Sequence, residues 1–370
     1  MRMPGVRTVG VEEELILVDA RTGEPIAVSS AVLASAALRG DEAGEVFEKE
    51  LHQEQLEFAT RPMTDMGELR QEIVRWRGEA QRYAREAGAL VAALATSPLP
   101  VEPSRHLGVR YRWMAEQFAL TTREQLTCGC HVHVAVESDD EGVAVLDRIR
   151  PWLYLLSALS GNSPFWQGQD SGYSSYRSRV WNRWPSAGPY ELFGSAERYH
   201  EQVEAMLATG VLRDPGMIYF DARLSSSYPT VEIRVADVCL EPDTTVLVAT
   251  LARGLVETAA RAWRNGGTPP RVSAGLLRLA SWRAARSGLR GPLVHPVTLR
   301  ETTPEAAFDA LVRHTEEALR DSGDLDDVRR GIATHLTRGG GADRQRALLA
   351  EGLSLGEVVR RCAQITTAAR

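Results

Sequence analysis

Three acidic residues stand together near the start of the chain, in a segment that alternates like a β-strand. In Val11-Glu12-Glu13-Glu14-Leu15, the two-residue period places Glu12 and Glu14 on one face and Glu13 on the other. Two carboxylates on one buried face repel each other unless a cation lies between them. The pattern therefore indicates either a metal site or an edge strand whose acidic face is in water.

A second acidic group follows at Glu50, Glu54 and Glu57. Glu50 and Glu57 have opposite parity, so in a regular strand their side chains point to opposite faces. They reach the same site only if a bulge or a break lies between them. Alone, this pair is a weak indication of a metal site.

Two cysteines and two histidines occur within Cys128-Gly129-Cys130-His131-Val132-His133. A zinc site needs these ligands to converge, but in a strand His131 and His133 share one face while the cysteines point to the other. The histidines are either ligands or hydrogen-bonded residues of a half-buried sheet. We expect Gly129 to leave room for a ligand beside His131.

A later strand-like segment, residues 230–237, carries Glu232 and Arg234 on one face. One interpretation is an ion pair on an antiparallel sheet. The other is a metal carboxylate beside a guanidinium whose fork suits phosphate oxygens.

The segment 160–192 has no regular period and is rich in glycine, serine and aromatic residues. Stretches of this length without a period are often functional. We expect it to close over a site and exclude water. Its Arg177 and Arg179 either bind a carboxylate or a triphosphate or are ordinary surface residues.

Strands and helices are dispersed along the chain with little regular strand–helix–strand order, which favours an α+β fold with an antiparallel sheet. The expected strands are 8–19, one or two within 46–60, 126–137 and two within 217–238. The expected helices are 65–95, 143–159 and 244–264, followed by a mostly helical region with breaks near 288–296 and 338–341.

The composition excludes several classes of protein. With 44% hydrophobic and 25% charged residues, the 370-residue chain is globular rather than disordered. Its net charge of −6 argues against nucleic-acid or anionic-membrane partners. It lacks an apolar run of about 18 residues and a signal peptide, and its four cysteines indicate a reducing cytoplasm.

Lys49 is the sole lysine of the chain, and no glycine loop precedes it. A P-loop or a Schiff-base enzyme needs a lysine in a defined context, so both are disfavoured. If this protein handles phosphates, it must do so with arginine and metal. Paired carboxylates with one or two imidazoles suit Mg²⁺ or Mn²⁺ better than structural zinc.

Five motifs follow one another over nearly the whole chain, at residues 10–15, 55–60, 129–133, 161–177 and 230–237. Together they resemble the carboxylate–amine ligase family, also called type-2 glutamate–cysteine ligases, of the glutamine synthetase superfamily. The resemblance implies a curved antiparallel sheet that forms a funnel, with metals inside and helices outside. It implies a single domain over residues 1–370, with a C-terminal helical region at about 271–370.

The resemblance also implies roles for residues at matching positions. The implied metal ligands are Glu12, Glu14, Glu50, Glu57, His131 and Glu232. His133 matches a nucleotide-contacting position and Arg234 a phosphate-contacting, catalytic one. Arg177 and Arg223 match positions for phosphate or substrate carboxylate, with Arg177 also expected to be catalytic, and Arg179 is added from its chemistry alone.

The implied reaction is ATP-dependent amide formation with Mg²⁺, or alternatively Mn²⁺. The γ-carboxylate of glutamate takes the γ-phosphoryl group of ATP, and the amine of an amino acid, L-cysteine by default, displaces phosphate. The expected partners are these small molecules and a second copy of the chain. The alternatives are a guanidino-kinase-like phosphotransferase, an inactive ligand-binding relative and a zinc module built on Cys128 and Cys130.

Overall fold

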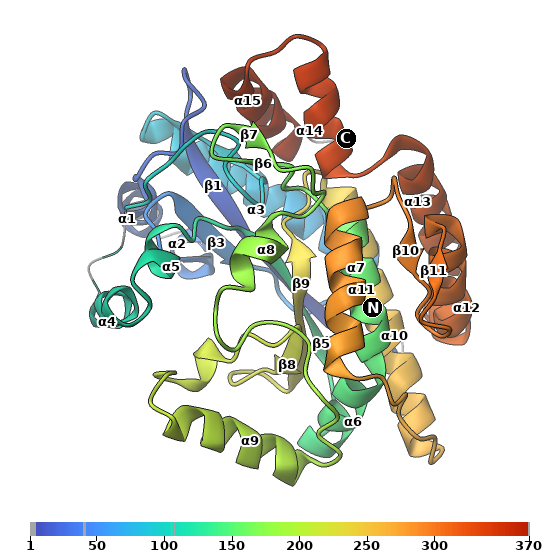
Figure 1. Cartoon of the computed structure of the whole chain (residues 1–370). Helices are drawn as coiled ribbons and strands as arrows, with labels where there is room; N and C mark the ends of the chain where they lie inside the picture. The colour runs from blue at the N-terminus through green and yellow to red at the C-terminus, as the bar shows by residue number, and fades with distance from the viewer. Residues whose placement is uncertain (1–4, 40–41, 105, 107, 369–370) are drawn as a thin grey trace.

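A computed structural model describes residues 5–39, 42–104, 106 and 108–368 (Figure 1). Its main sheet has seven strands in the order β2-β3-β1-β5-β9-β8, and β4 also pairs with β1. All of these pairs are antiparallel. The strands are β1 (Val9–Asp19), β2 (Phe47–Glu48), β3 (Gln55–Ala59), β4 (Ala89–Ala92), β5 (Gly129–Ala135), β8 (Ala222–Leu224) and β9 (Thr230–Asp237).

Helices cover one face of this sheet, and α10 (Pro242–Arg264) packs against its central strands β1, β5 and β9. Packed beside α10 are α3 (Met66–Glu86), α6 (Asp139–Ile149), α7 (Leu153–Ser160) and α12 (Pro304–Ser322). The remaining helices are α1 (Ser29–Arg39), α2 (Ala43–Val46), α4 (Val109–Phe118), α5 (Leu120–Arg123), α8 (Arg177–Trp181), α9 (Ala196–Ala208), α11 (Ala274–Ser287), α13 (Leu325–Arg338), α14 (Gly341–Ala350) and α15 (Leu355–Thr366).

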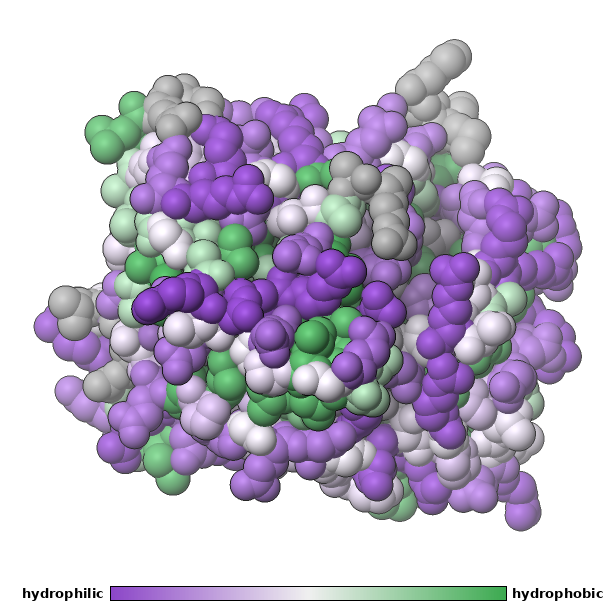
Figure 2. Space-filling model, turned by 90° about the horizontal axis from the view of Figure 1, so that it is seen from above, coloured by the Kyte–Doolittle hydropathy of each residue, from purple (hydrophilic) through white to green (hydrophobic). Residues whose placement is uncertain are grey.

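Short elements complete the chain. The hairpins are β6 (Phe165–Trp166) with β7 (Gln169–Asp170) and β10 (Leu293–Val294) with β11 (Glu301–Thr302). Single 3₁₀ turns lie at Arg150–Trp152 and Pro215–Met217. Seen from above, most of the surface is hydrophilic, with hydrophobic side chains in patches between the charged ones (Figure 2). No helix in the described ranges is both long and apolar enough to span a bilayer.

Two expected helices differ from the structure. The helix expected over 65–95 ends at Glu86, and Ala89–Ala92 forms strand β4 instead. Gly88, at φ +74°, makes the break because its conformation is rare for other residues. The helix expected over 143–159 is divided by the 3₁₀ turn that contains Pro151.

Part of the segment 160–192 is anchored in the protein, so the expectation of a closing loop is wrong for Asn162, Ser163 and Ser175. Asp237 accepts hydrogen bonds from the Asn162 backbone at 2.9 Å and from the hydroxyls of Ser163 and Ser175 at 2.7 and 2.8 Å. These partners are fully buried. These three residues are therefore held in place by Asp237.

A buried ion pair joins the sheet to the helices behind it. Arg77 of α3 donates two hydrogen bonds of 2.7 Å to Glu13 of β1, and both side chains are 0% exposed. Thr245 of α10 donates to the same carboxylate, and Arg77 also donates to the carbonyl oxygens of Cys239 and Leu240. Both carboxylate oxygens of Glu13 therefore accept hydrogen bonds on the helix-covered face of the sheet.

Replacing Arg77 by leucine leaves the Glu13 carboxylate buried without a counter-charge. We expect Arg77→Leu to lower the free energy of unfolding by about 3–5 kcal/mol. Glu13→Gln combined with Arg77→Leu removes both charges and recovers much of that loss. Urea unfolding followed by circular dichroism measures both values; equal stability of the single and double variants would contradict this account.

Candidate active site

A row of ionisable side chains crosses the sheet on the face opposite the Glu13–Arg77 pair. Antiparallel register places these residues side by side, because directly opposed residues share a face. The opposed pairs are Glu57 with Glu14, Glu12 with His131, His133 with Glu232, and Glu232 with Arg223. The row therefore continues over strands β3, β1, β5, β9 and β8.

The first cluster is Glu12, His131 and Glu232, whose candidate ligand atoms lie within 4.8 Å of one another. Glu12 lies 3.1 Å from His131 Nδ1 and 3.1 Å from His133 Nε2. Burial opposes ionisation of Glu12, but the hydrogen bonds with both histidines lower its pKa below the ordinary value. Burial lowers the pKa of His131, and the nearby Arg234 guanidinium lowers it further.

The second cluster is Glu14, Glu50 and Glu57, also within 4.8 Å of one another. Glu50 lies between β2 and β3, outside both strands. The alternation of side chains along a strand therefore does not apply between Glu50 and Glu57, and the two side chains can reach the same site. Burial raises the pKa of Glu57 well above its usual value, and the charges of Glu50, Glu12 and Glu14 raise it further. The pKa of Glu14 is raised by burial and by Glu50.

These two clusters fit a divalent cation. The crowded carboxylates have no full set of counter-charges, and His131 Nε2 is buried without a hydrogen bond in the described structure, 3.8 Å from Glu14 Oε1. A hard cation with oxygen ligands and one imidazole would relieve both features. The six implied metal ligands are thus brought together by the fold.

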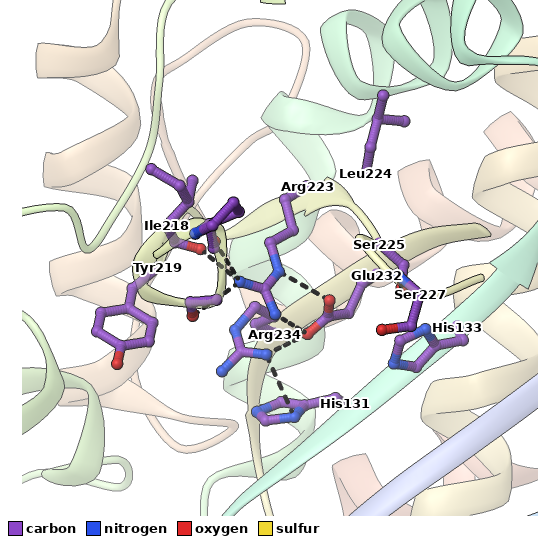
Figure 3. Close-up of polar contacts among 12 residues, drawn as sticks. His131, His133, Ile218, Tyr219, Arg223, Leu224, Ser225, Ser227, Glu232 and Arg234 are labelled. Atoms are coloured by element: carbon purple, nitrogen blue, oxygen red, sulfur yellow. Dashed lines mark hydrogen bonds and ion pairs between the residues drawn. The ribbon is translucent and has the colours of Figure 1, made fainter. Parts of the chain in front are cut away.

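Arg223 and Arg234 flank Glu232 (Figure 3). Arg223 donates to both carboxylate oxygens of Glu232, at 2.7 and 3.1 Å, and Arg234 also forms an ion pair with it. Burial would raise the pKa of Glu232, but Arg234 and Arg223 lower it to about 2. Arg234 Nη1 also lies 3.5 Å from His131 Nδ1, so this guanidinium is at the edge of the first cluster.

Arg177 lies beside the second cluster but outside the main cavity. It is 2% exposed, 4.0 Å from Asp237, and its charge lowers the pKa of Glu14. A Cβ added to Gly129 would lie 2.9 Å from Arg177 Cζ. The space expected beside Gly129 for a ligand is therefore filled by Arg177, and that expectation is wrong.

A β-bulge explains how Asp237 reaches Arg177. The register of β5 with β9 shifts between Cys130 and Val132, so one extra residue of β9 changes which face its later side chains occupy. Asp237 consequently lies opposite Gly129, on the side of His131, rather than with Ile233.

The row of charges lines one wall of a cavity of about 310 Å³. Sequence reasoning missed Arg110, Tyr111 and Tyr219 in its lining, because nothing in their local pattern marks them. It also did not place Lys49 or residues 225–228, the turn between β8 and β9, at the cavity. Arg110 pairs with Asp214 at 3.0 Å, and Tyr228 is 64% exposed beside His133.

The cysteines take no part in this lining. Cys128 and Cys130 are fully buried, and the Cys130 thiol lies near Glu13 and Arg77 on the other face. Burial raises the pKa of both thiols well above the usual value, which disfavours the thiolate that zinc needs. Neither candidate ligand cluster of the described residues includes a cysteine.

Comparison with known proteins gives one consistent family. A family model described as glutamate-cysteine ligase family 2 (GCS2) matches residues 8–364. A protein of Streptomyces avermitilis, provisionally named glutamate–cysteine ligase 2-1, is 64% identical over 98% of this chain and 99% of its own. A Streptomyces coelicolor protein with a similarly provisional name, glutamate–cysteine ligase 2, is 62% identical over 98% of this chain and 100% of its own.

Solved structures share the fold at low sequence identity. The bifunctional glutathione synthetase of Pasteurella multocida has a TM-score of 0.73 at 16% identity, covering 98% of this chain and 52% of its own. The glutamate–cysteine ligase of Francisella tularensis, solved with AMP, has a TM-score of 0.70 at 13% identity, covering 99% and 90%. The expected α+β fold, a ligase-type antiparallel sheet with outer helices, is confirmed.

Removing one carboxylate of the second cluster tests whether it holds a cation. We expect Glu57→Gln to fold with wild-type stability or slightly better, because it relieves repulsion, and to lose the thermal stabilisation that MnCl₂ gives the wild type. Thermal unfolding with and without MnCl₂ measures this, with the exposed Glu45→Gln as matched control. An unchanged MnCl₂ shift in Glu57→Gln would show that the cation binds elsewhere.

Proposed function

Because this chain belongs to glutamate–cysteine ligase family 2, it is an ATP-dependent carboxylate–amine ligase, and we propose that it activates the γ-carboxylate of L-glutamate and joins it to the amine of an amino acid. L-Cysteine is the default acceptor. The observation that carries the proposal is the row of carboxylates, histidines and arginines along one wall of a single cavity.

We assign Mg²⁺, or Mn²⁺, to the two clusters, with Glu12, His131 and Glu232 in one and Glu14, Glu50 and Glu57 in the other. When bound there, such a cation supplies positive charge to phosphate oxygens. Glu232 forms ion pairs with the guanidinium groups of both Arg223 and Arg234, so its negative charge also holds these two side chains at the cavity wall.

The nucleotide is assigned to the end of the cavity at His133. There the residues of the turn 225–228 supply hydroxyl groups, and the exposed ring of Tyr228 lies 6.2 Å from the His133 ring in an edge-on arrangement. An aromatic ring and hydroxyl groups suit the base and the sugar of a nucleotide.

Arg234 is assigned to the transferred phosphoryl group, because it is the guanidinium at the edge of the first cluster. It stabilises the negative charge that develops as the glutamate carboxylate takes that group and ADP leaves. Arg177 is assigned a positioning role, because it is buried behind Glu14 and touches no space of the main cavity.

We also retain the homodimer as a proposal. Of the C-terminal leucines, Leu348 packs into the chain's own core, while Leu349 is 37% exposed. Sedimentation at micromolar concentration measures the assembly directly. We also propose that the enzyme acts in the cytoplasm and that its substrates are small molecules.

The decisive assay supplies ATP, MgCl₂ and L-glutamate with each of the twenty L-amino acids and follows ADP and products by mass spectrometry. We expect one ADP for each new γ-glutamyl amide. Glu232→Gln should lower turnover by at least about 100-fold, because it removes a cation ligand and releases two arginines. Glu45→Gln is the control and should keep wild-type turnover.

Two results would contradict the proposal. ADP formed together with a stable phosphorylated acceptor and no amide would identify a phosphotransferase. Amide formation from another carboxylate, with none from L-glutamate, would overturn the assignment of the donor while leaving the ligase chemistry intact.

A further inference from the structure

A second, smaller cavity lies behind Arg234. It measures about 40 Å³, room for a few water-sized groups and far too little for a nucleotide. Trp181, Tyr219 and Arg234 line both this cavity and the main one, so the two spaces are neighbours. Tyr219 and His133 lie on opposite sides of Arg234 (Figure 3), which puts the small cavity at the end away from the assigned nucleotide position.

Asp221 is one of the residues that line this small cavity. In the pairing of β8 with β9, Arg223 lies opposite Glu232. The Arg234 amide donates to the Asp221 carbonyl at 2.9 Å, so the same register continues and places Asp221 opposite Arg234. Asp221 shares the parity of Arg223, whose side chain faces the site. The Asp221 amide also donates to the Gly188 carbonyl at 3.0 Å, which fixes the backbone.

The Asp221 carboxylate has no direct partner among the described residues: no hydrogen bond or ion pair involves it. The guanidinium opposite it, Arg234, is paired with Glu232 instead. Asp221 is half-buried, and a half-buried carboxylate without a direct partner is unfavourable.

Arg179 faces the same small cavity from α8. Its Nε is buried and makes no hydrogen bond, and no ion pair involves its side chain within the described ranges. Asp221 and Arg179 interact electrostatically without touching. The cavity thus presents one unpaired negative and one unpaired positive group, the complement of the ammonium and carboxylate groups of an α-amino acid.

We propose that this cavity receives only the charged groups of the amino-acid acceptor, whose side chain stays in the neighbouring main cavity, with Asp221 binding the ammonium group and accepting the proton that the amine must lose, and Arg179 binding the α-carboxylate. The inference rests on the proposed function, since it concerns the second half of amide formation. Arg234, which lines both spaces, then lies beside both the phosphoryl group and the amine.

The step balances as follows. The ammonium group transfers one proton to the Asp221 carboxylate, and the freed nitrogen lone pair forms the C–N bond at the acyl carbon. The bond from that carbon to the phosphate oxygen breaks, and the departing phosphate takes the second proton from nitrogen. A general base works best when its pKa is near the working pH.

Burial raises the pKa of Asp221 to about 7, while Arg278 and Arg179 oppose this rise. The other charged or titratable groups near it are Arg234, Arg177, Tyr154, Tyr219 and Tyr190. Tyr219 and Tyr190 have pKa values raised by burial and are neutral at pH 7. Among the described residues that line this cavity, Asp221 is the sole carboxylate that can take the proton.

Hydroxylamine separates proton removal from the rest of the reaction, because it is already unprotonated at neutral pH and carries no carboxylate. With ATP, MgCl₂ and L-glutamate, we expect Asp221→Asn to form γ-glutamyl hydroxamate within about three-fold of the wild-type rate. With the best L-amino-acid acceptor of the twenty, L-cysteine being tried first, its kcat should fall by at least about 100-fold. Asp140→Asn, an exposed aspartate, is the matched control.

Arg179→Gln should raise the KM for the amino acid about ten-fold or more, with hydroxamate formation unchanged. Equal loss of both products in Asp221→Asn would indicate a structural role, and equal retention would show that Asp221 is not the proton acceptor; either overturns the inference. A wild type that forms hydroxamate but uses none of the twenty amino acids overturns it as well. A wild type that forms no hydroxamate from glutamate instead contradicts the proposed function.

Discussion

Repulsion between like charges on one face of β1 governs the whole arrangement. Glu12, Glu13 and Glu14 are consecutive, and the two faces of the strand treat their charges differently. Glu13 is neutralised completely by Arg77 and Thr245, so the helices can pack over it without water. Glu12 and Glu14 join neighbours of the same sign from β3 and β9, and the protein's own cations balance them only in part. Because of this excess of negative charge, the face of the sheet that carries Glu12 and Glu14 can bind cations instead of being covered by apolar side chains.

The arginines of this face have distinct tasks that follow from their surroundings. Arg177 is fixed behind Glu14, in the space that Gly129 leaves open, and lies near Asp237, which also anchors the segment from Asn162 to Ser175. Arg223 and Arg234 share Glu232, which keeps two positive charges at the cavity wall. A guanidinium fork can bind a carboxylate and still present N–H groups elsewhere, which a lysine ammonium does less well. A site with so little lysine therefore has sufficient donors for phosphate.

Much of this could be predicted from local pattern, and the exceptions have identifiable causes. The two-residue period correctly separated Glu12 and Glu14 from Glu13, and His131 from Cys130, because β1 and β5 are regular there. For Glu50 it required a bulge or a break before Glu57, and the structure supplies the break because Glu50 lies outside the strands. The face of Asp237 is set by a bulge that no residue type announces. The early residues of 160–192 look like a mobile loop because their anchor, Asp237, is distant in sequence. Asp221 has no local pattern that marks it, and only the pairing of β8 with β9 shows that it lies opposite Arg234.

The position of Arg234 between two spaces has a consequence for the order of the reaction. An acyl phosphate is destroyed by water unless an amine reaches it first, so the amine has to be waiting near the acyl carbon without competing for the cation site. A protonated amine is repelled by the same cations and guanidiniums that attract phosphate. A separate carboxylate on the far side of Arg234 gives that ammonium group a favourable position outside the phosphate field. One guanidinium, held by Glu232, can thus line both a place for phosphoryl transfer and a place for the nucleophile.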